Sequence, residues 1–163
     1  MIDNLTEAVG GIGASLVIPL FVIMGYEVFA RFLLDLPTFW AYEIAYMLTG
    51  AHFVLGIAYV TKHRRHIRVD FLYSRYPRRV RAAIDCAVYV LFLFPVSAWI
   101  SWRLGAVAVE AYAVGEVSGE SAWNPVIWPL RSVVAFGYSL FTLQILAEAL
   151  KTFRDALGGP PAP

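Results

Sequence analysis

The stretch that decides the fold is IAYMLTGAHFVLGIAYVTKHRR, residues 44–65. It contains no Asp, Glu, Lys or Arg up to residue 61, and basic residues follow at once. An α-helix rises about 1.5 Å per residue and the hydrocarbon core of a bilayer is about 30 Å thick, so a span needs about 20 mostly apolar residues. The stretch therefore predicts a membrane-spanning helix that ends at a basic loop.

Three other uncharged stretches divide the chain in the same way: residues 8–26, 86–102 and 132–147. The last two each continue through a single arginine into further apolar sequence. We therefore predict an all-α membrane protein with four transmembrane helices in a single domain. The predicted spans cover residues of about 8–34, 40–61, 80–106 and 125–150.

The composition supports a membrane protein and excludes several soluble classes. Of the 163 residues, 60% are apolar and 15% are charged, against roughly 45–50% and 25% in soluble proteins. The net charge of +1 creates no overall field that would attract nucleic acid. A single cysteine, Cys86, excludes an intrachain disulfide. The first span is predicted to be uncleaved, because two acids and no base precede an apolar block longer than that of a signal peptide.

Special residues inside the spans indicate local deviations from a straight helix. Pro19 and Pro95 each remove a backbone donor and should kink the first and third spans. Small residues cluster in residues 10–15, where Gly10 and Ala14 are four apart. Small residues at that spacing allow helix backbones to approach closely in lipid. We expect this face of the first span to help hold the protein in a membrane complex.

Positive charges predict the orientation, because they gather in one connector. Residues 107–124 contain three glutamates and neither Lys nor Arg. The positive-inside rule makes 62–79 a cytoplasmic loop and 107–124 a periplasmic one, so that four spans leave both termini in the cytoplasm. We expect residues 156–163 to form a disordered tail. Eight of the 13 basic residues lie in or beside the cytoplasmic loop: Lys62, Arg64, Arg65, Arg68, Arg75, Arg78, Arg79 and Arg81.

The basic loop is typical of a membrane-surface segment. Apolar and charged residues of 66–76 can separate onto two sides of a short interfacial helix that lies in the headgroup layer. We expect the arginines around it to contact lipid phosphates, and we expect no nucleic-acid partner. These arginines are Arg64, Arg65, Arg68, Arg78, Arg79 and Arg81.

A pair of opposite charges lies inside the first span. Glu27 and Arg31 are four residues apart, with the acid first, and therefore share one helix face. Glu43 and Arg131 are expected at the same outer level and are candidate partners of this pair. We interpret the group as a structural lock or an interface to a partner subunit, since a self-neutralised pair leaves no net charge to attract a substrate. An ion or substrate site is the alternative, and Glu43 could also complement the positive end of the second helix.

His52 lies near the middle of the second span and is predicted to be a hydrogen-bonded packing residue. A haem ligand is the alternative, but it would need an axial partner on a facing helix, whereas His63 and His66 belong to the cytoplasmic loop. Motifs of phosphate-binding loops, serine nucleophiles and zinc proteases are absent from the sequence. We therefore expect no enzyme activity and no catalytic, cofactor-binding or metal-binding residue on this chain.

Three motifs between the spans resemble a known family. They are Trp40-Ala41-Tyr42-Glu43, His66-Ile67-Arg68-Val69-Asp70, and Gly115-Glu116-Val117-Ser118 followed by Trp123-Asn124-Pro125. From about Gly10 to Leu150, the chain resembles the small membrane subunit of tripartite ATP-independent periplasmic (TRAP) transporters, the DctQ-like family. The family-motif positions are Trp40, Glu43, His66, Val69, Asp70, Ser118 and Pro125.

This resemblance implies a scaffold subunit of a transporter in a bacterial or archaeal inner membrane. Such a subunit binds a larger, roughly twelve-helix membrane subunit, and a periplasmic binding protein delivers organic acids to the pair. A sodium gradient drives uptake, and the sodium and substrate sites lie in the larger subunit. Two other classes stay open: a small homo-oligomeric exporter of lipophilic cations, which would need an unpaired acid, and a haem-carrying electron-transfer subunit.

Overall fold

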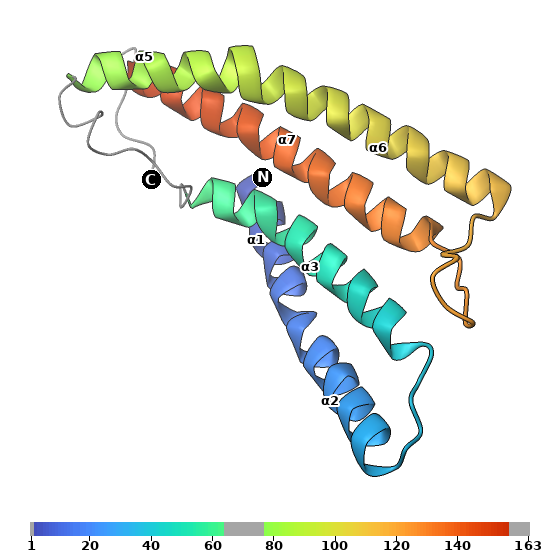
Figure 1. Cartoon of the computed structure of the whole chain (residues 1–163). Helices are drawn as coiled ribbons and strands as arrows, with labels where there is room; N and C mark the ends of the chain where they lie inside the picture. The colour runs from blue at the N-terminus through green and yellow to red at the C-terminus, as the bar shows by residue number, and fades with distance from the viewer. Residues whose placement is uncertain (1, 64–76, 157–163) are drawn as a thin grey trace.

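The computed structural model describes residues 2–63 and 77–156. These residues form long helices joined by two short connectors (Figure 1). The helix α1 continues into α2, and α5 continues through the short π-helix η1 into α6, so that four rods are long and apolar enough to cross a membrane. The predicted all-α architecture with four spans is confirmed. The bounds are α1 (Ile2–Ser15), α2 (Val17–Leu33), α3 (Ala41–Lys62), α5 (Arg78–Val88), η1 (Tyr89–Leu93), α6 (Phe94–Val114) and α7 (Trp128–Ala156).

Several helix ends differ from the sequence prediction. The first rod starts at Ile2, ahead of residue 8, and α7 starts at Trp128. The helix α6 runs to Val114, so residues 107–114 are helical where a loop was expected. It stops at Gly115, which takes up the left-handed conformation (φ 64°) that commonly ends a helix. The acidic connector therefore comprises residues 115–127.

Some predictions fall on parts of the chain that the structure does not describe. They are the interfacial helix at 66–76, the tail beyond residue 156, and the positions Arg64, Arg65, His66, Arg68, Val69 and Asp70. The side chains of Arg78, Arg79 and Arg81 also lie outside the described part, although their backbone begins α5.

Both prolines lie beside interruptions of regular α-helix. Ahead of Pro19, the helix breaks at Leu16, whose N–H bonds to the Gly13 carbonyl in a tighter turn (3.2 Å). Ahead of Pro95, the chain forms η1, where the N–H of Phe94 reaches back five residues to the carbonyl of Tyr89. A proline cannot donate to the carbonyl four residues before it, so the preceding turn adopts another hydrogen-bond pattern.

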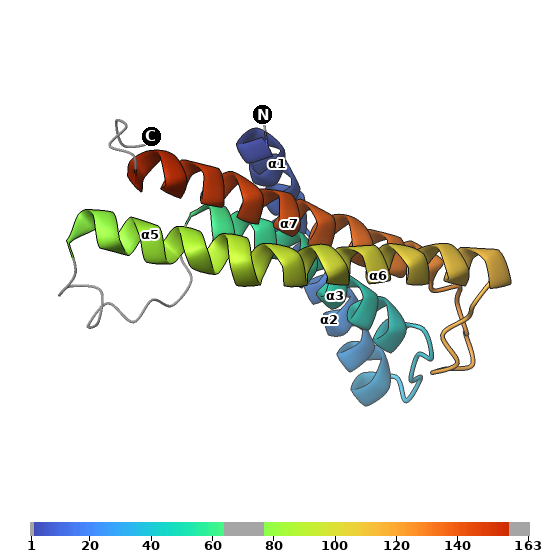
Figure 2. The same cartoon turned by 90° about the horizontal axis from the view of Figure 1, so that it is seen from above.

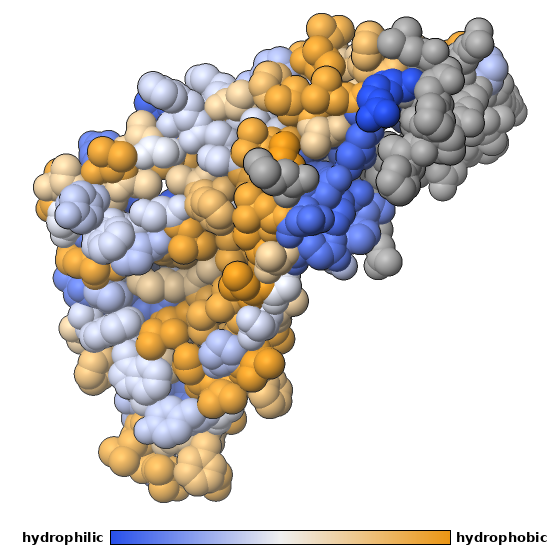
Figure 3. Space-filling model, turned by 180° about the vertical axis from the view of Figure 1, so that it is seen from behind, coloured by the Kyte–Doolittle hydropathy of each residue, from blue (hydrophilic) through white to orange (hydrophobic). Residues whose placement is uncertain are grey.

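The rods form an open row with α3 and α7 at its centre (Figures 1 and 2). The first rod packs mainly on α3, while α5, η1 and α6 pack along α7. In the most apolar window of each rod, 39% of the residues are buried in α7 and only 6% in the rod that contains α6. Figure 3 shows hydrophilic surface gathered toward one end of the molecule, with orange apolar and pale surface over most of the rest. Large apolar faces are thus left for lipid or for a partner.

Glycines set how closely the central helices approach. A Cβ at Gly10 would lie 2.7 Å from Cβ of Tyr59, and a Cβ at Gly13 would lie 3.0 Å from Cβ of Leu55, both on α3. A Cβ at Gly11, in contrast, would meet no heavy atom within 4 Å. The small residues of the first span therefore present two faces, one packed inside this chain and one open.

Candidate functional site

The Glu27 carboxylate is bonded on both sides near the end of α2. It accepts hydrogen bonds from Nε of Arg31 (2.9 Å) and from its terminal guanidinium nitrogen. It also accepts from the Thr38 N–H (3.1 Å) and hydroxyl. Glu27 is 7% exposed. Glu27 therefore folds the connector 34–40 back onto α2, and its charge is neutralised, unlike the unpaired acid that a cation exporter would need.

Replacing Glu27 by alanine is expected to release the connector. The Thr38 amide would lose its acceptor, and the Arg31 guanidinium would lose its counter-charge. Amide hydrogen exchange in a lipid nanodisc should therefore become several-fold faster at Thr38. Replacing Ser139 by alanine serves as the control, because its hydroxyl bonds within α7 to Ala135. Unchanged protection of Thr38 in the Glu27→Ala protein would contradict this assignment.

The structure does not bring Glu43 and Arg131 to the Glu27–Arg31 pair. Glu43 lies in the first turn of α3, is 2% exposed and accepts a hydrogen bond from the hydroxyl of Ser121. Its second carboxylate oxygen has no hydrogen-bond partner among the described residues. Arg131 instead donates to Glu116 (2.6 Å). The four charged residues that the sequence analysis grouped together therefore form three separate contacts. The reason is that the charged side chains of α3 and α7 both point toward the connector 115–127.

The connector 115–127 is internally bonded, and two family-motif positions hold it together. The Ser118 N–H donates to the Pro125 carbonyl (2.9 Å), beside a bridge between Val117 and Val126. The N–H of Gly119 donates to the side chain of Asn124 (2.7 Å). A third motif position, Trp40, stacks on Tyr26 of α2, with ring centroids 5.9 Å apart.

A buried polar network, which the sequence analysis missed, joins α1 to α7. Gln144 is fully buried; its amide oxygen accepts from the Thr6 hydroxyl (2.9 Å), and its nitrogen donates to Asp3 (3.0 Å) and Glu148 (3.3 Å). Lys151 donates to Asp3 (2.9 Å) and Glu148 (2.8 Å). The sequence feature that could have indicated this network is the spacing of Gln144 and Glu148, two polar residues one turn apart inside the last span. Buried polar groups in a span pair with one another.

The end of α3 lies beside this polar network. Lys62 donates to the backbone carbonyl of Asp3 (3.0 Å) and forms an ion pair with Glu7. The start of α1, the end of α3 and the last turns of α7 therefore lie together, and the connectors 34–40 and 115–127 join the spans at their other ends.

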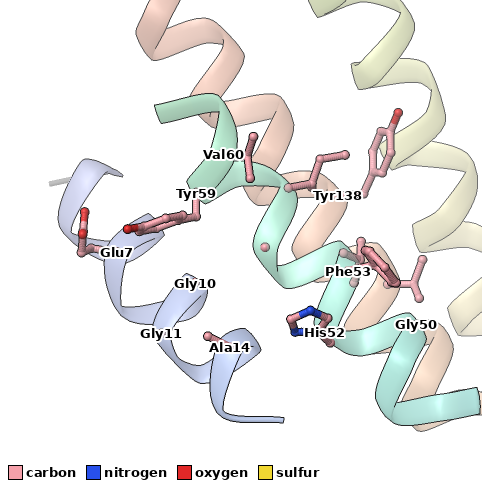
Figure 4. A pocket seen from close by; sticks show the side chains of 14 residues that line it. Glu7, Gly10, Gly11, Ala14, Gly50, His52, Phe53, Tyr59, Val60 and Tyr138 are labelled. Atoms are coloured by element: carbon pink, nitrogen blue, oxygen red, sulfur yellow. The ribbon is translucent and has the colours of Figure 1, made fainter. Parts of the chain in front are cut away.

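His52 packs against the first rod. Its Nδ1 lies 2.8 Å from the Gly13 carbonyl oxygen. A carbonyl oxygen can only accept, so Nδ1 carries the proton. His52 also lines a groove of about 1040 Å³ between α1, α3 and α7 (Figure 4). Among the described residues, no group of three or more His, Cys, Asp or Glu could hold a metal ion.

Comparison with known families gives a match over most of the chain. A family model described as "Tripartite ATP-independent periplasmic transporters, DctQ component" covers residues 20–155. The chain belongs to this family. The resemblance seen in the sequence motifs is confirmed, and the chain is a multi-pass membrane component of a transporter. The family is a permease component and not a class of enzymes.

Two curated relatives are similar to this DctQ-family chain. One is the sialic acid TRAP transporter small permease protein SiaQ of Vibrio cholerae serotype O1, 24% identical over 100 residues, which cover 61% of this chain and 56% of the relative. The other is the sialic acid TRAP transporter permease protein SiaT of Haemophilus influenzae, 24% identical over 120 residues, which cover 74% of this chain and 19% of the relative. The matched part thus spans just over half of SiaQ and about a fifth of SiaT.

Proposed function

We propose that this chain is the scaffold subunit of a TRAP transporter that imports an organic acid across a bacterial or archaeal inner membrane. It binds a larger, roughly twelve-helix permease subunit, and a periplasmic binding protein delivers the substrate. The family match over residues 20–155 carries this proposal. The exposed apolar sides of the rods support it, since a chain with so few buried residues leaves wide surfaces for another membrane protein.

In this proposal, the sodium and substrate sites lie in the larger subunit, and a sodium gradient drives uptake. The ion pairs of the present chain support this division of labour. Glu27 pairs with Arg31, and Lys151 pairs with both Asp3 and Glu148. Paired charges hold helices together and offer little to an ionic substrate. The names of both relatives contain sialic acid, a carboxylic acid, which makes carboxylic acids the first substrates to test.

The proposed orientation places the end with Lys62 in the cytoplasm and the connectors 34–40 and 115–127 in the periplasm. The common position of the start of α1, the end of α3 and the last turns of α7 supports this arrangement, because Lys62 and Lys151 both bond to Asp3 and both ends of the chain therefore lie with the end of α3. In this orientation the basic loop lies on the side of the anionic inner leaflet.

Reconstituted transport tests the proposal directly. The chain, a co-expressed large permease subunit and the soluble binding protein would be placed in proteoliposomes with labelled sialic acid and other carboxylic acids. We expect uptake that requires all three proteins and an inward sodium gradient. Omission of this chain should reduce uptake to the level of empty vesicles. Full uptake without this chain, or equal uptake without the sodium gradient, would contradict the scaffold role or the proposed driving force respectively.

A further inference from the structure

The groove between α1, α3 and α7 is open at two glycines. It is lined mostly by small and apolar residues, among them Ala14 and Phe53, with Tyr138 on the α7 side (Figure 4). A Cβ at Gly11 or at Gly56 would meet no heavy atom within 4 Å. The surface at these two positions is bare backbone, which is the kind of surface that another membrane helix can approach closely.

His52 places a hydrogen-bond acceptor in this groove, near the middle of the second span. Because Nδ1 donates its proton to Gly13, Nε2 is the ring nitrogen left to accept a hydrogen bond. Among the described residues, Nε2 has no hydrogen-bond partner. An unpaired polar atom in hydrocarbon is costly. A lipid acyl chain carries no donor, whereas hydroxyl and amide side chains on a protein helix do.

We propose that this groove is the docking site for one transmembrane helix of the larger permease subunit, and that a hydroxyl or amide of that helix donates to Nε2 of His52. The proposal rests on the proposed function, because it takes the permease as the partner. SiaT supports this occupant: it is a permease protein, and only 19% of it matches this chain. A stretch similar to this chain therefore occurs within a longer permease polypeptide.

Matched glycine substitutions locate the docking surface. Gly25 on α2 and Gly105 on α6 lie outside the groove, and a Cβ at either position would meet no heavy atom within 4 Å, as at Gly11 and Gly56. Co-purification with a tagged large subunit would compare Gly11→Leu and Gly56→Leu with Gly25→Leu and Gly105→Leu. We expect the two groove variants to bind the large subunit about tenfold more weakly, because the added side chains overpack the interface. The two control variants should bind it as the original chain does. Thermal unfolding of each isolated variant should match the original chain.

Two isosteric variants test the acceptor on His52. The amide of Gln reaches the position of Nε2, whereas the amide of Asn reaches only the position of Nδ1. We expect the His52→Gln variant to co-purify with the permease as the original chain does. The His52→Asn variant should co-purify with several-fold less of it. Equal retention of the permease by both variants would overturn the assignment of Nε2 as an acceptor for the partner.

The remaining outcomes separate this proposal from others. Loss of co-purification in Gly25→Leu or Gly105→Leu alone would place the partner on another face and overturn the proposal. Normal co-purification of the groove variants with loss of bound phospholipid, measured by mass spectrometry, would make the groove a lipid site and overturn it as well. Failure of the unsubstituted chain to bind the permease would instead overturn the proposed function.

Discussion

Replacing Gly10 by alanine is expected to destabilise the isolated chain strongly, although it adds one methyl group. The new Cβ would lie 2.7 Å from Cβ of Tyr59 and 2.8 Å from its ring atom Cδ2, closer than carbon atoms can pack. A movement of the Tyr59 ring would not relieve the contact with its own Cβ, so α1 has to move away from α3. Overpacking of this kind costs about 1–3 kcal/mol.

Thermal unfolding in detergent, followed by circular dichroism, would measure this loss. Gly25→Ala is the matched control, because a Cβ at Gly25 meets nothing within 4 Å. At an open helical position, alanine is favoured over glycine by about 0.5–1 kcal/mol, so the control should melt at the same or a slightly higher temperature. A melting temperature of Gly10→Ala equal to that of the control would show that α1 does not pack on α3 through Gly10.

Replacing Gln144 by leucine is expected to disconnect α1 from α7. The Thr6 hydroxyl would lose its acceptor, and Asp3 and Glu148 would each lose one donor. Thr6 is fully buried and Glu148 is 2% exposed, so water cannot replace their bonds to Gln144 in the folded chain. Each buried group left unsatisfied costs about 1–3 kcal/mol. The thermal unfolding midpoint in detergent should fall well below that of the unsubstituted chain.

A double-mutant cycle separates the hydrogen bond from the loss of packing. Replacing Thr6 by valine removes the donor, and the combination with Gln144→Leu removes both partners and leaves neither group stranded. We expect the double variant to be more stable than the sum of the two single losses predicts, since contacting residues are not additive. Ser139→Ala on the same helix should have only a small effect. Strict additivity would show that the Thr6–Gln144 bond does not connect the helices.

The part of the site that could be predicted from the sequence is the part made by near neighbours in the chain. Glu27 and Arg31 are one turn apart, so any helix through them places the two charges on one face. The contact of Thr38 with Glu27 was not predictable in this way, because it depends on how the connector 34–40 folds back. The partners of Glu43 and Arg131 depend similarly on the path of the connector 115–127.

The sequence by itself determined the number of spans, because the length of an uncharged stretch relates directly to the thickness of a bilayer. It also placed the family motifs at the connectors. Only the tertiary structure decided which small residues pack and which stay open. Gly10 and Gly11 are neighbours in the chain, yet one contacts Tyr59 and the other faces empty space. The spacing of residues sets their relative directions around a helix, but the rotation of α1 against its neighbours depends on contacts such as that of Thr6 with Gln144 on α7, 138 residues apart.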